Sequence, residues 1–324
     1  MPDHGQSGWI VERGIGEDRA LKLADGRVVG ARCYRHGELF AGPIVDAQLT
    51  SKLAGARRGT AITQTGTEVL VDHLPPHLTE GARFPVTITR APLRERDRVK
   101  PAQGRYSETP ATPRSRWMAE ASAVRAFPKD EWGEIWQAAF EGRAEFDGGA
   151  LLFYVTPAMT LIDVDGDLPA LGLCRRAVPA LARWLALFDL GGSIGIDFPT
   201  LSTKADRKAV DAALEMALSH WPHERTAMNG FGFVQIVARM EGPSLLHRMA
   251  GDRVGMAARF LLRSAERAEG AGRVLAMTCH PGFAGKLSEA WLAELQRRTG
   301  KEVRITADPR IAIGGGHAQI VADD

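Results

Sequence analysis

Apolar and polar residues alternate in short runs over the first quarter of the chain. The runs "WIVERG", "ALKLADGRVVGARCY" and "GTAITQTGTEVLV" are separated by turn residues, and a period of two is typical of strands with one buried face. Asp25 and Gly26 lie between two apolar stretches, and this dipeptide favours a two-residue hairpin. Residues 9–89 are therefore predicted to be all-β, with a small barrel as the expected form.

From residue 117 onward the pattern changes to alternating helices and strands. Apolar residues recur at helical spacing in segments 117–127, 130–142, 176–190 and 203–221. Short apolar runs typical of strands fill segments 149–155, 159–165, 193–198 and 231–240. This order predicts one mixed sheet covered by helices. Helical and strand patterns then alternate again from residue 246 and predict a small α+β tail.

A segment without an apolar period separates these two regions. Residues 92–116 are crowded with Pro, Arg and Lys, which is typical of a linker or an extended arm. Two interpretations stay open for its cations: they are solvated, or they contact phosphate.

The composition is that of a folded protein with more than one small core. The chain has 324 residues, of which 44% are hydrophobic and 25% are charged, so disorder as the main state is excluded. The formal net charge is only +2, so any binding of a polyanion must depend on local clusters of charge. The three cysteines are far apart, and this argues against a disulfide framework or a structural zinc site.

The chain is expected to be cytoplasmic. Its first residues lack the basic segment and apolar core of a signal peptide. The most apolar stretch, residues 150–164, is shorter than the roughly 20 apolar residues that a membrane span needs. No association with a membrane is predicted.

Two aspartates interrupt apolar strands in matching contexts. Asp163 lies in "LIDVDGD" and Asp197 in "SIGIDF", and the helix predicted between them would make the two strands neighbours in the sheet. A buried carboxylate without a partner is costly, so each needs a hydrogen-bond donor, a cation or a metal. Two interpretations stay open: each aspartate binds backbone N–H groups in a turn, or the pair holds a metal.

Mg²⁺ is the natural metal for such a pair, with Mn²⁺ as a second candidate. Mg²⁺ binds one or two carboxylates, retains several waters and contacts substrate phosphate. A metal of this kind lowers the pKa of a bound water and neutralises charge on phosphate oxygens. Asp165 lies on the same strand face as Asp163 and is a candidate to orient a water or support the ion. The predicted chemistry is phosphodiester cleavage.

Basic residues begin the helix that follows Asp197. Lys204, Arg207 and Lys208 share one face of this helix. Positive charge there opposes the helix dipole, and a phosphate at the helix N-terminus would compensate it. These three residues are therefore candidate contacts to an RNA backbone, with a solvated charged face as the alternative.

Several motifs of the central segment, and one near the end of the sequence, resemble the ribonuclease E/G family and its catalytic core. They are "TPAMTLIDVDGD", "FDLGGSIGIDF" with its Asp-Leu-Gly-Gly run at 189–192, the basic helix after it, "NGFGFVQIVARM" and, more loosely, "RTGKEVRITADPRI". The resemblance implies a metal-dependent endoribonuclease that cuts single-stranded RNA and leaves a 5′ phosphate and a 3′ hydroxyl. Asp163 and Asp197 take the places of the family's Mg²⁺-holding aspartates.

The resemblance also implies an α+β (mixed α/β) fold with several subdomains. These are a deoxyribonuclease-I-like catalytic subdomain at 150–245, an RNase H-like subdomain in two parts at 1–30 and 117–149, an inserted OB-fold β-barrel at 31–95, a basic, Pro-rich linker at 96–116 and a small C-terminal α+β domain at 246–324.

The sequence departs from the family pattern at four places. The family often has Asn where Asp165 stands, and its Arg before Phe-Gly is Gly230 here, which removes a phosphate contact. Residues 241–256 contain no cysteine where the family's zinc linker should follow, so neither zinc nor a zinc-linked oligomer is expected. The segment that recognises a 5′ monophosphate is replaced by the Pro/Arg linker.

Together these patterns predict a compact Mg²⁺-dependent endoribonuclease for RNA processing or decay. Its expected partner is single-stranded RNA, with A/U-rich RNA and ribosomal precursors as candidate substrates. The barrel segment "GTAITQTGTEVLV" has no aromatic residue for base stacking, so RNA binding there would depend on Arg57, Arg58 and the linker arginines. The alternative is an RNA-binding or regulatory protein of the same fold that cuts weakly or not at all. A third hypothesis is a phosphohydrolase that acts on something other than RNA.

Overall fold

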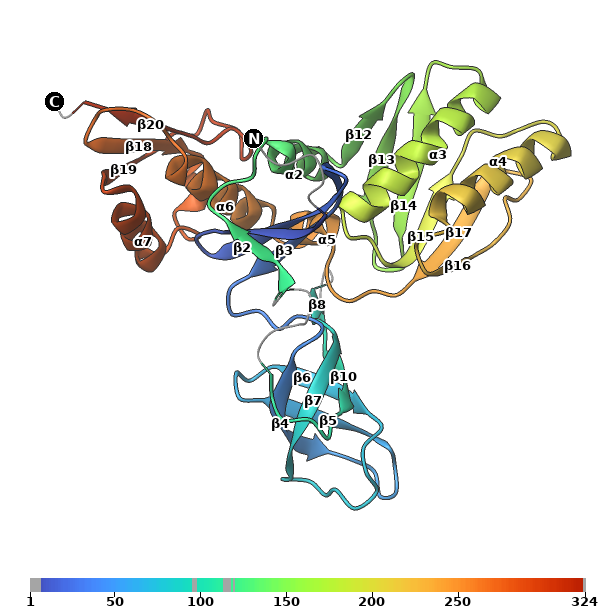
Figure 1. Cartoon of the computed structure of the whole chain (residues 1–324), viewed down its shortest axis with the longest axis horizontal. Helices are drawn as coiled ribbons and strands as arrows, with labels where there is room; N and C mark the ends of the chain where they lie inside the picture. Colours follow the sequence, from blue (N-terminus) through green and yellow to red (C-terminus); the bar gives the residue numbers. More distant parts are fainter. Residues whose placement is uncertain (1–6, 95–97, 113–117, 119, 323–324) are drawn as a thin grey trace.

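The computed structural model shows a mixed α+β protein with a closed β-barrel and a six-stranded mixed sheet (Figure 1). It describes residues 7–94, 98–112, 118 and 120–322. The barrel projects from the rest of the molecule, and the large mixed sheet lies on the side away from the chain termini (Figure 1).

A four-stranded sheet lies at the centre of the molecule. Its strands are β1 (Gly8–Arg13), β2 (Glu17–Ala24), β3 (Arg27–Arg35) and β11 (Ser122–Val124), in the order β11-β1-β2-β3. Asp25 and Gly26 form the predicted hairpin between β2 and β3. The helix predicted over 117–127 is wrong at residues 122–124, because these residues pair in parallel with β1, and such long-range pairing overrides local helical spacing.

Five strands close the predicted small barrel. They are β4 (Ile44–Ser51), β5 (Arg58–Thr63), β6 (Glu68–Asp72), β7 (Arg83–Arg90) and β10 (Ala102–Tyr106), joined in the order β10-β6-β5-β4-β7. This closed five-stranded barrel is consistent with an OB fold. It has its own apolar core, built around residues such as Leu49, Val69 and Val86.

Part of the predicted linker is structured. Residues 102–106 form β10, which pairs with both β6 and β7 and closes the barrel. The short strands β8 (Leu93–Arg94) and β9 (Val99–Lys100) form a ribbon just before it. The linker interpretation is therefore wrong for these residues, while residues 95–97 and 113–116 lie outside the described part of the chain.

The six-stranded sheet carries the two candidate aspartates. Its strands are β12 (Arg143–Phe146), β13 (Gly149–Val155), β14 (Thr160–Gly166), β15 (Gly192–Asp197), β17 (Phe233–Ala238) and β16 (His223–Arg225), in that spatial order. Helices α3 (Ala170–Leu187) and α4 (Lys204–Leu218) pack side by side on one face (Figure 1). Ile162, Ile196 and Val234 point into the core beneath these helices. Strands β13, β14, β15 and β17 and helices α3 and α4 follow the predicted order, whereas β12 and β16 were not predicted.

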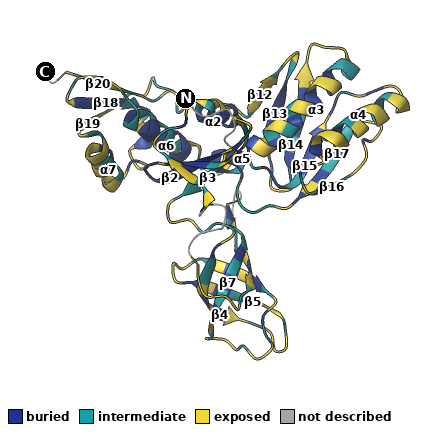
Figure 2. Cartoon of the chain, in the orientation of Figure 1, coloured by how far each residue is buried: buried dark blue, intermediate teal, exposed yellow. Residues whose placement is uncertain are grey.

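The remaining elements pack around the central sheet. They are α2 (Glu131–Glu141), α5 (Leu245–Gly251), α6 (Arg253–Glu266), η1 (Pro281–Phe283) and α7 (Glu289–Thr299), with a three-stranded sheet of β18 (Val274–Cys279), β19 (Glu302–Ala307) and β20 (His317–Val321). One continuous apolar core runs from the central sheet into both the six-stranded sheet and this tail (Figure 2). None of the described helices is long and apolar enough to cross a membrane.

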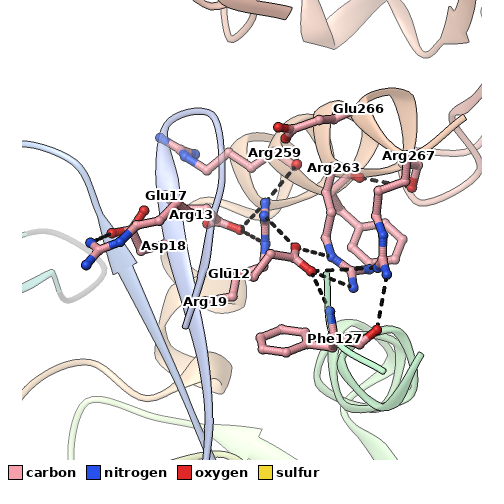
Figure 3. Close-up of polar contacts among 12 residues, drawn as sticks. Glu12, Arg13, Glu17, Asp18, Arg19, Phe127, Arg259, Arg263, Glu266 and Arg267 are labelled. Atoms are coloured by element: carbon pink, nitrogen blue, oxygen red, sulfur yellow. Dashed lines mark hydrogen bonds and ion pairs between the residues drawn. The ribbon is translucent and has the colours of Figure 1, made fainter. Parts of the chain in front are cut away.

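A buried network of charged side chains joins the first strand to the tail (Figure 3). The carboxylate of Glu12 on β1 accepts hydrogen bonds from Arg263 Nε on α6 at 2.7 Å and from the backbone N–H of Phe127 at 3.3 Å. Arg19 on β2 donates to Glu12 at 3.4 Å and to Glu17 at 3.0 Å. Segments far apart in sequence therefore meet at one carboxylate.

Candidate active site

Asp163 and Asp197 lie side by side on neighbouring strands. Strands β14 and β15 run parallel, and their register places Asp163 directly opposite Asp197 and Ile162 directly opposite Ile196. Successive side chains of a strand point to opposite faces. Because both isoleucines are fully buried in the core, both aspartates point to the other face of the sheet. We call this the open face.

The open face explains why carboxylates occur in these strands. Asp163 is half-buried and Asp197 is exposed, so neither side chain replaces a core residue. Asp197 is the last residue of β15, and Asp163 is the fourth of the seven residues of β14, where the pairing with β15 ends. The two carboxylates therefore lie together at the point where β15 ends. The alternation of apolar and polar positions in "LIDVD" and "SIGID" therefore produces two aspartates on one surface.

The carboxylates at this edge repel one another. Partial burial raises the pKa of Asp163, and the negative charges of Asp197 and then Asp165 raise it further. Asp165 follows on the same face of β14, where it pairs with Ala150 of β13. Within the described part of the chain, no ion pair joins Asp163 or Asp197 to a basic side chain. The unneutralised charge fits a site for a cation.

A cation at this edge would have two principal protein ligands. No group of three or more His, Cys, Asp or Glu side chains among the described residues is arranged to hold a metal. A pair of carboxylates nonetheless suits Mg²⁺, which keeps several waters and is commonly held by one or two carboxylates together with substrate phosphate. The donor set is all oxygen, with no thiolate or imidazole to favour zinc.

The basic helix begins where the sequence predicts. Thr203 caps α4, because its Oγ1 accepts a hydrogen bond from the backbone N–H of Asp206 at 3.0 Å. Lys204 and Lys208 are exposed. Arg207 is half-buried, and its Nη1 donates to the backbone carbonyl of Leu201 at 2.6 Å. Arg207 thus braces the loop before the helix, which its spacing in the sequence did not predict.

The barrel arginines lie on a different lobe from the aspartates (Figure 1). Arg58 begins β5 and forms an exposed ion pair with Asp72 on the neighbouring strand. Arg57 and His73 line the same shallow hollow. The structure therefore does not bring these arginines together with Asp163 and Asp197, and Arg58 is already paired.

The Asp-Leu-Gly-Gly run has a structural explanation. Asp189 has a positive φ of 51° at the turn after α3 and forms an ion pair with Arg32 of β3 at 3.3 Å. A Cβ on Gly191 would lie 2.5 Å from the carbonyl oxygen of Arg239. The run therefore lets the chain turn tightly from α3 into β15 and pass close to the end of β17.

A basic cleft lies at the opposite end of the same two strands. It has a volume of about 700 Å³ and reaches from the base of the barrel to the starts of β14 and β15. Its lining includes Arg90, Arg94, Lys100 and His247, together with Ser193 on the open face. The sequence pointed only to the linker cations here, because the cleft forms from segments that are far apart in the chain.

A rigid turn lies beside Asp197, within the motif "NGFGFVQIVARM", where the sequence predicted a strand from residue 231 and not a turn. In residues 229–233, Asn229 Oδ1 accepts hydrogen bonds from the backbone N–H groups of Phe231 at 2.9 Å and Phe233 at 3.0 Å. Phe233 is the residue of β17 that pairs with Asp197. The signal that could have revealed this turn is Asn-Gly before an aromatic pair.

Gly232 is required in this turn, and its replacement by alanine is expected to destabilise the protein by about 1–3 kcal/mol. Its φ is 94°, and an added Cβ would lie 2.2 Å from the carbonyl oxygen of Phe198. Urea unfolding of the variant measures the loss. The matched control is Gly230→Ala, because no atom lies within 4 Å of a Cβ at Gly230. Equal stability of the two variants would contradict the geometry.

Comparison with curated proteins shows a relationship to ribonuclease G. Over 129 residues the chain is 32% identical to ribonuclease G of Escherichia coli K12, in an alignment that covers 36% of this chain and 26% of that protein. Ribonuclease G of Shigella flexneri and of Salmonella typhimurium SL1344 match with the same identity and coverage. The chain is related in sequence to ribonuclease G.

This relationship confirms the predicted resemblance to the ribonuclease E/G family. The alignment spans only about a quarter of the length of these curated relatives (26%). No protein-family model matches the chain.

Proposed function

We propose that the protein is a metal-dependent endoribonuclease that cleaves single-stranded RNA. The observation that carries this proposal is the register of β14 and β15, which puts Asp163 opposite Asp197 on the open face without a neutralising basic residue among the described side chains. The sequence relationship to proteins named ribonuclease G supports RNA as the substrate.

Asp163 and Asp197 are the proposed ligands of Mg²⁺, with Mn²⁺ as the second candidate. The ion would supply a water of lowered pKa and neutralise charge that develops on the phosphate oxygens. Asp165, next along the open face, would orient a water or support the ion from the outer sphere. The products would carry a 5′ phosphate and a 3′ hydroxyl.

The RNA backbone would follow the open face from the aspartates toward the basic cleft. Lys204 and Lys208 are exposed at the start of α4, which follows the carboxyl end of β15. Arg94 and Lys100 line the cleft at the opposite end of the strands. The strand rise of about 3.3 Å per residue separates the two aspartates from the cleft end of β14 and β15 by roughly 10–13 Å. An RNA strand of a few nucleotides would therefore contact both.

The family resemblance supplies the remaining parts of the proposal. The six-stranded sheet with α3 and α4 would be the deoxyribonuclease-I-like catalytic subdomain, and the central sheet with its flanking helices the RNase H-like subdomain. The enzyme would act without zinc and without recognition of a 5′ monophosphate. A/U-rich RNA and ribosomal precursors are its candidate substrates.

Cleavage of a labelled single-stranded A/U-rich RNA tests the proposal. Internal cuts that require Mg²⁺, disappear with EDTA and leave 5′ phosphates are the expected result. Failure to cut any of a panel of single-stranded RNAs with either Mg²⁺ or Mn²⁺ would overturn it.

A double change of Lys204 and Lys208 to glutamine is expected to weaken RNA binding several-fold. A plot of log affinity against log salt concentration has a negative slope, and each phosphate contact contributes about 0.7 to its magnitude for a single strand. Loss of two contacts should therefore reduce the magnitude of the slope by about 1.4. Binding titrations at several salt concentrations measure this. Lys129→Gln removes an exposed lysine that lies just before α2 and is the control. An unchanged slope in the double variant would exclude these lysines from the RNA path.

One observation favours the alternative of an RNA-binding protein that cuts little. The described barrel exposes Leu53, Ile62 and Leu70 as its large apolar side chains, and none of them can stack on a base as an aromatic ring does. Such a protein would shift RNA in a gel with or without Mg²⁺ and would not shorten it.

A further inference from the structure

We infer that Phe231 is a stacking platform for a nucleobase next to the scissile phosphate. The inference rests on the proposed function, because it assumes that RNA occupies the open face at Asp163 and Asp197. It adds a residue that selects and positions the substrate at this edge of the sheet.

Phe231 is 81% exposed, although hydrogen bonds to Asn229 hold the turn that carries it. An exposed phenylalanine forgoes the stabilisation that burial of its ring would bring. A single exposed apolar residue needs no explanation by itself. The position of Phe231 and the rigidity of the turn that carries it provide the argument.

The turn is fixed on both sides. Besides the two hydrogen bonds that Asn229 Oδ1 accepts, the backbone N–H of Gly232 donates to the carbonyl of Asn229 at 3.2 Å. The segment after Asp197 holds the turn from the other side: Thr200 Oγ1 donates to the carbonyl of Phe231 at 3.2 Å. The backbone of Phe231 is therefore anchored to the chain that carries the proposed metal ligand, while its ring extends into solvent.

The distance to the aspartates suits one nucleotide. Phe233 pairs with Asp197 across β15 and β17, and Phe231 precedes it by two residues, which places the two Cα atoms at most about 7 Å apart. A nucleotide with its phosphate at the aspartates would have its base, or that of a neighbour, within reach of the ring. Stacking on an aromatic ring is the contact that unpaired bases make most readily, and it tolerates any base.

Phe231 also provides an exposed aromatic ring, which the described barrel does not. The large apolar side chains that the described barrel exposes are all aliphatic. In the six-stranded sheet, by contrast, Phe231 is exposed at the edge beside Asp197, and the ring of Phe233 lies over Gly195 on the open face. Aromatic contact with RNA is thereby assigned to the sheet that carries the aspartates.

Single-stranded RNAs with one 2-aminopurine at successive positions around the mapped cut test the inference. Binding is measured with the full chain in EDTA, where no cleavage occurs. We expect quenching of 2-aminopurine fluorescence at one position with the unaltered protein, its loss in Phe231→Ala and its return in Phe231→Trp. Met216→Ala, which removes another exposed apolar side chain (77%) near the far end of α4, should quench as the unaltered protein does.

Kinetics provide the second measurement. The KM of Phe231→Ala should rise about tenfold with little change in kcat, as expected when a contact is equally strong in the ground state and the transition state. An abasic nucleotide at the quenched position should raise the KM of the unaltered protein similarly and have no further effect on Phe231→Ala. Phe231→Leu keeps an apolar side chain in the turn and should behave like Phe231→Ala.

Two results separate the possible failures. If the protein cuts RNA but quenching and KM are the same with and without the Phe231 ring, the platform is wrong and the proposed function stands. If no RNA is cut under any condition, the proposed function fails, and the fluorescence in EDTA alone decides whether the ring binds a base.

Discussion

Replacing Asp197 by asparagine is expected to abolish Mg²⁺-dependent RNA cleavage in a protein that stays folded. The side chain is exposed on the open face and faces Asp163 in register, so the change leaves the core intact. A metal contributes several kcal/mol to transition-state stabilisation, and each 1.36 kcal/mol corresponds to a tenfold rate. We therefore expect a loss of at least about a hundredfold in kcat.

The same variant should be no less stable than the unaltered protein when metal is absent. Partial burial and then like charge from Asp197 raise the pKa of Asp163 in the folded state above the ordinary value of an aspartate. A carboxyl group with a raised folded pKa makes the folded state less stable as the pH rises through the window above 3.8, because the unfolded chain ionises more easily. Asp197→Asn removes that repulsion, so its melting temperature at neutral pH should equal or exceed that of the unaltered protein, and the difference should vanish at acidic pH.

Thermal unfolding with and without Mg²⁺ distinguishes the proposed metal binding by Asp197 from its repulsion of Asp163. Mg²⁺ should raise the melting temperature of the unaltered protein and leave that of Asp197→Asn unchanged, because a ligand stabilises only the state that binds it. Asp167→Asn, at an exposed aspartate just beyond β14, is the matched control and should retain cleavage and the Mg²⁺ shift. Full cleavage by Asp197→Asn would remove the metal site from the mechanism.

The six-stranded sheet could be predicted from the sequence because its signals are local. The apolar runs around Asp163 and Asp197 are strands, the intervening helix makes them parallel neighbours, and alternation sends both carboxylates to one face. Thr203 as a helix cap is likewise a signal within four residues. The metal and the reaction remain predictions, because the positions of two carboxylates do not determine which ion or substrate they bind.

The features that the sequence did not reveal all depend on contacts between distant segments. Strand β10 is short, contains Gly104 and a charged residue, and becomes a strand only by pairing with β6 and β7. Residues 122–124 have helical spacing but pair with β1. Arg207 has the position of a phosphate contact but binds the carbonyl of Leu201. In each case, a partner elsewhere in the chain decides the outcome.

Replacement of Glu12 by alanine is expected to cost about 3–5 kcal/mol of stability, because it removes the buried carboxylate that Arg19 and Arg263 share and leaves Arg19 with Glu17 alone and Arg263 with Asp130 alone. The carboxylate is 4% exposed and lies between Arg263 at 2.7 Å and Arg19 at 3.4 Å (Figure 3). Arg263 and Arg19 are themselves 4% and 1% exposed. Total stabilities of domains are about 5–15 kcal/mol, so urea unfolding at 25 °C should show a large shift of the midpoint.

Two further variants test whether the loss of stability comes from a buried arginine that has lost its carboxylate partner. Glu302→Ala breaks an exposed ion pair with Arg304 and should leave stability unchanged, because such surface pairs contribute little. The double variant Glu12→Met with Arg263→Met should be more stable than Glu12→Ala, because it removes a buried cation together with its anion. If Glu12→Ala unfolds at the same urea concentration as the unaltered protein, the network does not stabilise the fold. Since Glu12 joins β1, α6 and residue 127, we expect the first strand and helix α6 to unfold in one transition, which tryptophan fluorescence and circular dichroism would report at the same urea concentration.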